Sequence, residues 1–332
     1  MSELTNDFGV NITTESINKQ YQSETAQKPK FEFNPLNYLN TRLSDGETMK
    51  IMMIRILPFD PKGGEAFHKI HMHNVKVDKS VQASGWKRLP CPSKNHIEGI
   101  DTRCPFCDTA KKASEMAASS RNESDRKKYN DIAYINKARE YWIVRCIERG
   151  HEADGVKFWL FPHVKKGNGN YDKLMALYQT RMQAAKLQGK ESNIFDLYDG
   201  KDLILTITRD STGGNVINIT DADEKSPLTT DTALGAKWIN DPKKWNEVYT
   251  FKNFEYMEIL VQGGIPYWSS ELGKYVDKAE YEKSVEASRE TSFNQNYTEP
   301  KVDYSKIQAE VAQPLPKAVT VTTDENVDDL PF

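Results

Sequence analysis

The 332-residue sequence lacks a hydrophobic run long enough to span a membrane. A spanning helix needs about 18 consecutive apolar residues, and the longest apolar stretch, residues 49–59, is interrupted by Arg55. Residues 1–16 carry acids and amides where a secretory signal has a basic start and an apolar segment. These absences predict a cytoplasmic protein that does not associate with membranes.

Apolar residues are also scarce. With glycine counted and tyrosine left out, they make up about 39% of the chain, below the roughly 45–50% of typical globular domains. The length allows about two domains, so part of the chain is expected to lie outside a packed core. Residues 1–35 are predicted to form a flexible arm. Residues 284–332 are predicted to be a disordered tail, because their polar, acidic composition buries too little surface to offset the entropy of ordering.

The net charge of −3 is unevenly distributed. Residues 282–332 contain five Lys/Arg and ten Asp/Glu, a balance of −5, so the rest of the chain carries +2. An acidic tail on a nearly neutral body indicates an interaction or charge-screening element. A solvated terminus without function is the other interpretation of the same pattern.

The chain has only four cysteines, and three of them lie close together. In a reducing cytoplasm, the cluster of Cys91, Cys104 and Cys107 predicts metal binding before disulfides. The Cys104-Pro-Phe-Cys107 turn presents two sulfurs to one ion, and Cys91 supplies a third. Cys146 lies in the middle of a predicted strand and is expected to be an ordinary core residue.

A tetrahedral zinc ion needs a fourth ligand. The candidates are His68, His71, His73 and His96. Among these, His71 and His73 share one face of a predicted strand, so the pattern does not separate them. Four protein ligands leave no open coordination position, and the site is therefore predicted to hold one structural Zn²⁺.

The hydrophobic pattern predicts a mainly β protein with inserted helices. Strands are expected at 49–59, 66–77, 85–89, 141–147, 156–161, 203–208, 216–220 and 251–261, and helices at 105–119, 124–139 and 171–189. A small hairpin is expected around Gly273. This order favours an oligonucleotide-binding (OB) barrel in residues 36–225, with a zinc subdomain at about 66–120 and a C-terminal extension at 226–283.

Basic and aromatic residues alternate along several predicted strands. Such a combination suits sequence-tolerant binding of single-stranded nucleic acid, which uses a basic groove and stacking faces. Trp159 and Phe161 are expected on an exposed face with Lys157, opposite a core face that contains Phe158. A second apolar core is the alternative interpretation of each aromatic residue. The candidate contacts are Arg55, Lys69, Trp86, Lys87, Arg88, Tyr141, Trp142, Arg145, Arg149, Lys157, Trp159, Phe161, Lys165 and Lys166.

Taken in order, these features resemble a known family. An apolar strand ending in Leu-Pro-Phe59, a strand carrying histidines, Gly85-Trp86 and the Cys-x12-Cys-x2-Cys spacing are similar to the zinc-containing single-stranded DNA-binding proteins of tailed phages (gene-32 type). The resemblance covers about residues 36–225. It implies an OB barrel, zinc held by three cysteines and one histidine, and DNA as ligand. His73 is the best match for that histidine and His71 the runner-up. The family's short basic self-association motif is not seen in residues 1–35.

The end of the sequence resembles a different group. Val327-Asp-Asp-Leu-Pro-Phe332 is similar to the acidic tip of bacterial single-stranded DNA-binding proteins. The resemblance implies that the tip binds replication and recombination partners. A terminal aromatic ring and carboxylate suit an apolar pocket with an arginine, and flanking acids suit a basic rim. The candidate tip residues are Asp328, Asp329, Leu330, Pro331 and Phe332.

Together, the patterns predict a non-enzymatic protein that coats and protects single-stranded DNA in phage replication, recombination and repair. It would act in the host cytoplasm, as a monomer or with weak self-association on DNA. No phosphate-binding GxxxxGK[ST] loop is found, and the nearest paired acids, Asp221 and Asp223, lie in a turn-like segment. A zinc-containing assembly protein, or a factor associated with a primase or nuclease, remains the alternative.

Overall fold

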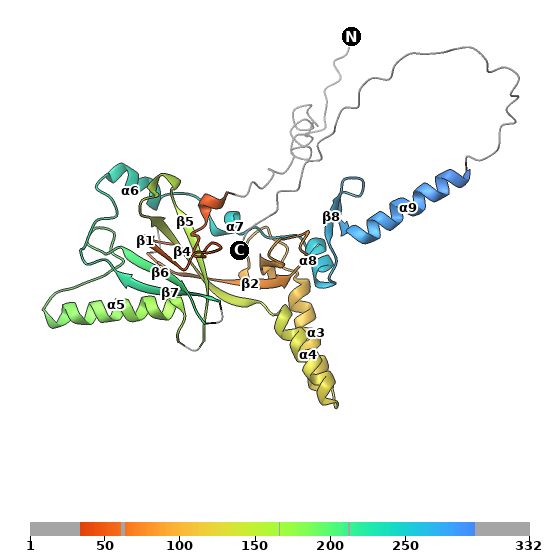
Figure 1. The fold of residues 1–332 in the computed structure, drawn as a ribbon, viewed down its shortest axis with the longest axis horizontal. Helices are drawn as coiled ribbons and strands as arrows, with labels where there is room; N and C mark the ends of the chain where they lie inside the picture. The colour runs from red at the N-terminus through yellow and green to blue at the C-terminus, as the bar shows by residue number, and fades with distance from the viewer. Residues whose placement is uncertain (1–33, 61–63, 166, 212, 296–332) are drawn as a thin grey trace, which may run out of the picture. The chain divides into compact units, whose positions relative to one another are not determined.

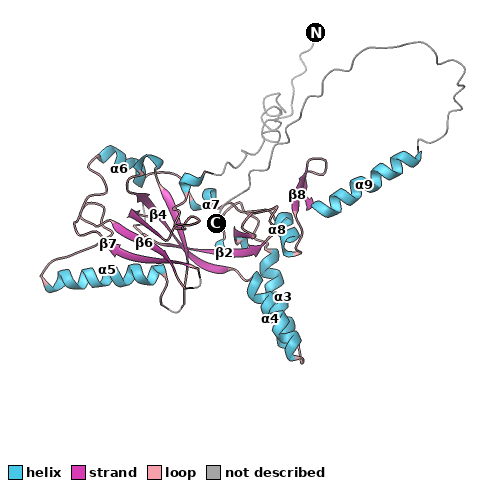
Figure 2. Ribbon diagram, in the orientation of Figure 1, coloured by secondary structure: helices cyan, strands magenta, loops and turns pink. Residues whose placement is uncertain are grey.

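The computed structural model describes residues 34–60, 64–165, 167–211 and 213–295, with side chains described up to residue 287. The chain divides into two units at Asn34–Pro35, and the fold below is that of the second unit. Its described residues are mainly β, with one large antiparallel sheet, a small hairpin and several helices (Figure 1, Figure 2). The predicted N-terminal arm, apart from its last residues, and the acidic tip lie outside the described residues.

Seven strands in the described part of the chain form the large sheet. They are β1 (Met49–Leu57), β2 (His68–Lys76), β3 (Trp86–Pro90), β4 (Arg139–Glu148), β5 (Lys157–Pro162), β6 (Leu203–Arg209) and β7 (Asn215–Asp221). Their order is β3-β2-β4-β1-β6-β7, and β5 pairs with β4 outside this path. The first half of β4 pairs with β2 and its second half with β1, while β5 pairs across both halves. The sheet therefore curls, and one of its faces encloses a core.

The helices lie between and after these strands. They are α2 (Pro92–Asn95), α3 (Pro105–Ser119), α4 (Glu123–Asn136), α5 (Asn170–Leu187), α6 (Thr232–Ile239), α7 (Trp245–Val248), α8 (Phe254–Val261) and α9 (Lys278–Gln295). Strands β8 (Pro266–Ser269) and β9 (Lys274–Asp277) form the expected hairpin around Gly273. No helix in the described ranges has the length and apolar character needed to cross a membrane.

Local signals account for the helices that were predicted. Pro105 stands in the first turn of α3, where its fixed φ suits a helix and its missing N–H costs nothing. The Asn122 side chain accepts a hydrogen bond from the Ser124 N–H at 2.9 Å and caps α4. These two helices form an antiparallel pair that projects from the sheet (Figure 1).

Two expectations about the C-terminal part are wrong. Residues 251–261 were expected as a strand, but Phe254–Val261 is helix α8, capped by Asn253, whose side chain accepts from the Tyr256 N–H at 3.1 Å. The buried residues of α8 follow a helical spacing, which a short apolar run does not reveal by itself. The disordered tail was expected from residue 284, but α9 continues to Gln295.

Among the described residues, buried apolar side chains form the following clusters. The first fills the inner face of the curled sheet and includes Ile54, Val144, Trp159 and Leu205. The second joins β2, β3 and the start of α3 to α8. The third packs α6 against the outer face of the sheet at Leu57, Ile147 and Val156. The extension after residue 226 thus covers parts of the sheet that would otherwise be exposed.

Candidate metal centre and basic groove

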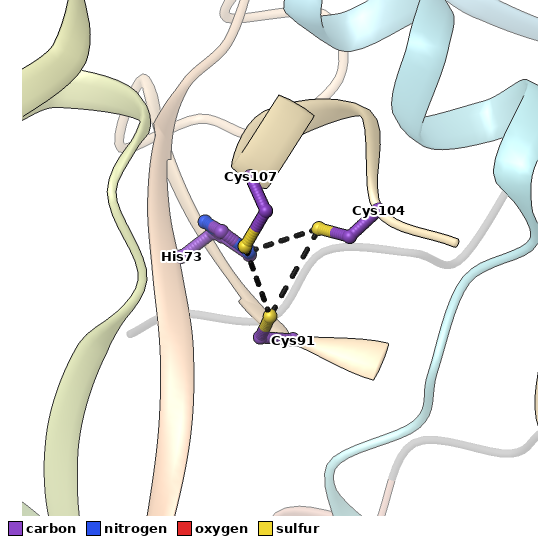
Figure 3. Close-up of side chains that lie close together, drawn as sticks. All are labelled: His73, Cys91, Cys104 and Cys107. Atoms are coloured by element: carbon purple, nitrogen blue, oxygen red, sulfur yellow. Dashed lines mark hydrogen bonds between the residues drawn. The ribbon is translucent and has the colours of Figure 1, made fainter. Parts of the chain in front are cut away.

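Three cysteines and one histidine meet in a buried cluster (Figure 3). The ligand atoms of His73, Cys91, Cys104 and Cys107 all lie within 4.8 Å of one another. The Cys91 sulfur is 3.5 Å from that of Cys107 and 3.9 Å from that of Cys104, and His73 Nε2 is 3.2 Å from the Cys104 sulfur. A disulfide needs about 2.05 Å, whereas thiolates around one tetrahedral zinc lie roughly 3.5–3.9 Å apart. The cluster can therefore hold a metal ion such as zinc.

The local fold places each ligand. Cys91 and Cys104 each precede a proline that begins a helix, α2 and α3 respectively, so both thiols lie at helix starts. Asn95 ties the first turn to β2, because its side chain donates to the His71 carbonyl at 2.8 Å and accepts from the His71 N–H at 2.8 Å. The Ser93 hydroxyl lies 3.3 Å from the sulfurs of both Cys91 and Cys107.

The histidine is oriented by a second contact. His73 Nδ1 lies 3.0 Å from the Asn136 carbonyl oxygen at the end of α4. Because a carbonyl oxygen only accepts, Nδ1 carries the proton and Nε2 faces the sulfurs, an arrangement typical of metal-binding histidines. Burial by itself lowers the pKa of His73, but the neighbouring Cys107 and Cys91 outweigh it and raise this pKa to about 9. Hydrogen bonds from Cys104 and Cys91 hold the pKa of the Cys107 thiol well below its usual range.

The structure selects His73 over His71 as the fourth member of the cluster. Residues two apart on a strand are about 6.7 Å apart, so only one of the two histidines reaches the sulfurs. His71 instead lies with its Nε2 3.8 Å from Glu140. Neither His68 nor His96 belongs to the cluster. Cys146 is fully buried in the core of the sheet, as predicted.

A basic groove lies near this cluster. It is a cavity of about 600 Å³ between residues 38–42, β3, β5, the start of α5 and the start of β7. Its charged lining residues are Arg42, Lys87, Arg88 and Lys173, and no Asp or Glu is among the described residues that line it. Five side-chain amides, of Asn40, Gln82, Asn168, Asn170 and Asn215, add neutral donors and acceptors. All the charged residues among the described lining of the groove are therefore positive.

The arginines of the groove repel each other. Burial lowers the pKa of Arg42, and the positive charge of Arg88 lowers it further. The Arg88 guanidinium lies 5.4 Å from the centre of the Tyr141 ring. Lys173 Nζ donates to the Ile217 carbonyl at 2.6 Å, while Lys87 directs its ammonium away, to the Tyr256 hydroxyl at 3.0 Å. An anion between the two guanidinium groups would relieve their repulsion.

Four of the predicted nucleic-acid contacts serve the fold instead. Arg55 and Arg149 are paired with Asp202. Lys157 is buried and pairs with Glu148 at 2.6 Å and Asp154 at 2.8 Å. The Arg145 guanidinium donates to the backbone carbonyls of Trp238, in the last turn of α6, and of Asp241, just after that helix. The expectation that Lys157 lies on an exposed face is wrong, and the charges of all four residues are paired or hydrogen-bonded within the protein.

The expected exposure of Trp159 and Phe161 is also wrong. Their side chains are 1% and 2% exposed and belong to the core inside the sheet. Phe158, on the opposite face of β5, is 1% exposed as well. Both faces of β5 are covered, so alternation along the strand does not separate core from surface. Neither ring can stack on a base, although both residues contribute to the floor of the groove.

The remaining predicted contacts are distributed around the sheet. Trp86 is 51% exposed and lies on the same side of β3 as Arg88. Tyr141 is buried. Trp142 stacks on Tyr171 at 4.2 Å, with Lys69 5.0 Å from its ring centre. Lys165 is exposed, and Lys166 and the five tip residues lie outside the described ranges.

Sequence reasoning missed Arg42 and Lys173. Arg42 lies in a segment without strand or helix periodicity, and Lys173 lies in the first turns of α5. Only the curled sheet brings these side chains to one groove, so no local signal could have indicated them. Comparisons with protein-family models and with curated proteins found no match for this chain.

Proposed function

We propose that this protein binds single-stranded DNA through the basic groove and has no catalytic activity of its own. The observation that carries the proposal is a groove with four basic residues and no acid among its described lining residues. Phosphate contacts supply most of the affinity in sequence-tolerant binding. In a chain with a net charge of −3, such a concentration of positive charge needs a specific reason.

The groove supplies phosphate-binding groups, and the adjoining strand β3 supplies an exposed aromatic ring outside the groove lining. Arg42 and Arg88 are the phosphate-binding pair, since a phosphate between them offsets their repulsion. Trp86 is the stacking residue, because it is half-exposed and shares a face of β3 with Arg88. Stacking on an aromatic ring tolerates any base, which suits a protein that coats DNA of varied sequence.

The bound metal in this proposal is one structural zinc ion. Cys91 follows β3 directly, so the ion would fix the strand that carries Trp86 and Arg88. The four protein ligands would complete a tetrahedral shell. The zinc ion would therefore stabilise the fold and take no part in catalysis. The curled sheet is interpreted as an OB barrel, in line with the resemblance to phage single-stranded DNA-binding proteins.

The acidic chain end has a separate role in the proposal. Asp328 to Phe332 would recruit replication and recombination proteins, as the resemblance to the bacterial tip implies. Residues 282–332 carry a balance of −5. In the absence of DNA, this charge would compete for the basic groove. The proposed protein protects single-stranded DNA during phage replication, recombination and repair, in the cytoplasm.

Titration of a fluorescein-labelled oligothymidylate by anisotropy, at several salt concentrations, tests the proposal. Replacing both Arg42 and Arg88 by alanine is expected to weaken binding at least tenfold and to lower the salt slope by about 1.4, since each lost contact with a single strand contributes about 0.7. The matched control is Arg121→Ala, which removes an exposed arginine between α3 and α4. Equal binding by the double variant and the control would reject the groove as the binding site.

A further inference from the structure

A second cavity lies between the start of β2, β4 and the connection from α6 to α7. It measures about 930 Å³, within the usual range for small-molecule sites of roughly 300–1,000 Å³. No residue that lines it also lines the basic groove. We call it the aromatic pocket, after Phe59, His68 and Trp245 in its wall.

The aromatic pocket presents flat rings. Phe59 and His68 are stacked, with ring centres 4.5 Å apart and 13° between their planes. Trp245 lies 6.4 Å from His68 at 41°. Burial lowers the pKa of His68, and Glu65 only partly opposes this, so the imidazole is neutral near pH 7. A neutral ring backed by a second ring suits stacking with a planar ligand.

A buried donor in the pocket wall lacks an acceptor. Arg145 is 2% exposed and lines the pocket. Its terminal nitrogens donate to the carbonyls of Pro58, Phe59, Trp238, Ile239 and Asp241. Its Nε is buried and has no hydrogen-bond partner. This N–H has almost no accessible surface, so it belongs to the packed wall and is not one of the groups that a ligand in the cavity would contact.

The rest of the lining mixes donors and acceptors. Asn240 and Asn246 provide amides, and the exposed Lys244 provides a positive charge. Asp60, Glu65 and Asp241 also line the pocket. These carboxylates suit a heteroaromatic ring whose edge both donates and accepts hydrogen bonds.

We propose that the aromatic pocket binds one nucleotide, with its base against His68 and its phosphate toward Lys244. The base edge would meet the amides of Asn240 and Asn246. The site is separate from the groove and does not depend on the proposed function. The nucleotide comes either from free solution or from an unstacked position of a bound strand, since the recognition chemistry is the same.

Equilibrium dialysis with dAMP and with dTMP tests the proposal on the full-length, zinc-loaded protein. Saturable uptake of one nucleotide per chain is expected. His68→Ala and Lys244→Ala should each weaken this uptake about fivefold or more, since a lost stacking ring or phosphate contact has effects of this order. His151→Ala, which removes an exposed histidine between β4 and β5, is the matched control. Because Lys244 is exposed, the Lys244→Ala variant tests nucleotide binding without changing the packing of the aromatic rings.

The source of the nucleotide is resolved by an oligonucleotide that carries 2-aminopurine. A fluorescence rise on binding to wild-type protein that is lost in His68→Ala identifies a nucleotide of the strand as the ligand. Uptake of dAMP without that rise identifies a free nucleotide. Absence of both signals, or equal results for His68→Ala and His151→Ala, would overturn the proposal. The oligothymidylate titration is a separate measurement, so failure here leaves the groove intact.

Discussion

Asp202 is the residue on which two buried cations depend. Arg149 donates to both of its carboxylate oxygens, at 2.8 and 3.0 Å, and Arg55 approaches at 3.4 Å. The Arg55 side chain is only 1% exposed. Burial lowers the pKa of Arg55, and Asp202 is the strongest opposing influence. Removal of the carboxylate would leave two guanidinium groups without their shared counter-charge.

Asp202→Asn is therefore expected to lower the free energy of unfolding by about 3–5 kcal/mol, the range for a buried ion pair that loses one partner. Urea unfolding followed by circular dichroism measures this. The control is Asp101→Asn, which breaks the exposed pair with Arg103 and should have a much smaller effect, because water screens an exposed ion pair. Similar losses in both variants would show that the buried network does not stabilise the fold.

At the residue scale, the sequence predicted the metal ligands better than the nucleic-acid contacts. Cys91, Cys104 and Cys107 were found because ligand spacing is a local property. The strand pattern did not separate His73 from His71, because the choice depends on how β2 meets α3, although the family resemblance favoured His73, the residue found in the cluster. The buried Arg55 and Trp159 were misassigned because their neighbours come from distant parts of the chain, which a strand pattern does not contain.

At the element scale, the metal cluster links three segments. Cys91 and Cys104 share an apolar cluster with Leu89 of β3 and with Tyr256 and Met257 of α8. Phe106 of α3 lies against the His73 ring at 5.0 Å. Helix α8 thus shares one apolar cluster with two of the candidate metal ligands. The order of α3 and α8 should depend on the bound ion.

Metal removal by a strong chelator is expected to increase amide exchange at least tenfold in α3 and α8, because metal binding supplies folding free energy to such modules. Exchange in β1, β6 and β7 should stay unchanged, since their core is a separate cluster. Cys107→Ser should reproduce the effect, and Cys146→Ala, which alters a cysteine outside the cluster, should retain one zinc per chain. Unchanged exchange in metal-free α8 would contradict this coupling.

The elements predicted from local signals were confirmed, and those that depend on packing were not. Helix α3 and the β4–β5 hairpin follow from a proline at a first turn and from a Gly-containing loop. Helix α8 was taken for a strand because short apolar runs fit both structures. Strand β5 is buried on both faces, at Trp159 and at Phe158, so its alternation gave the wrong surface.

At the scale of the whole molecule, the curled sheet assembles the basic groove. Arg42 precedes β1, Arg88 lies on β3, and Lys173 lies on α5. The mainly β class and the zinc-type cluster were predictable from patterns and spacing. The basic groove was not predictable, because its charged residues are distant in sequence. Only the folded sheet, with β5 and β7 lining the same cavity, brings them together.

Hydrogen exchange of the full-length protein, with and without oligothymidylate, shows whether the groove binds the strand. Protection is expected in residues 38–42, in β3 and at the start of α5, where the lining of the groove lies. Helices α3 and α4, which project from the sheet, serve as the internal control and should exchange equally in both states. Protection of α3 and α4 with no change along the groove would show that DNA binds elsewhere.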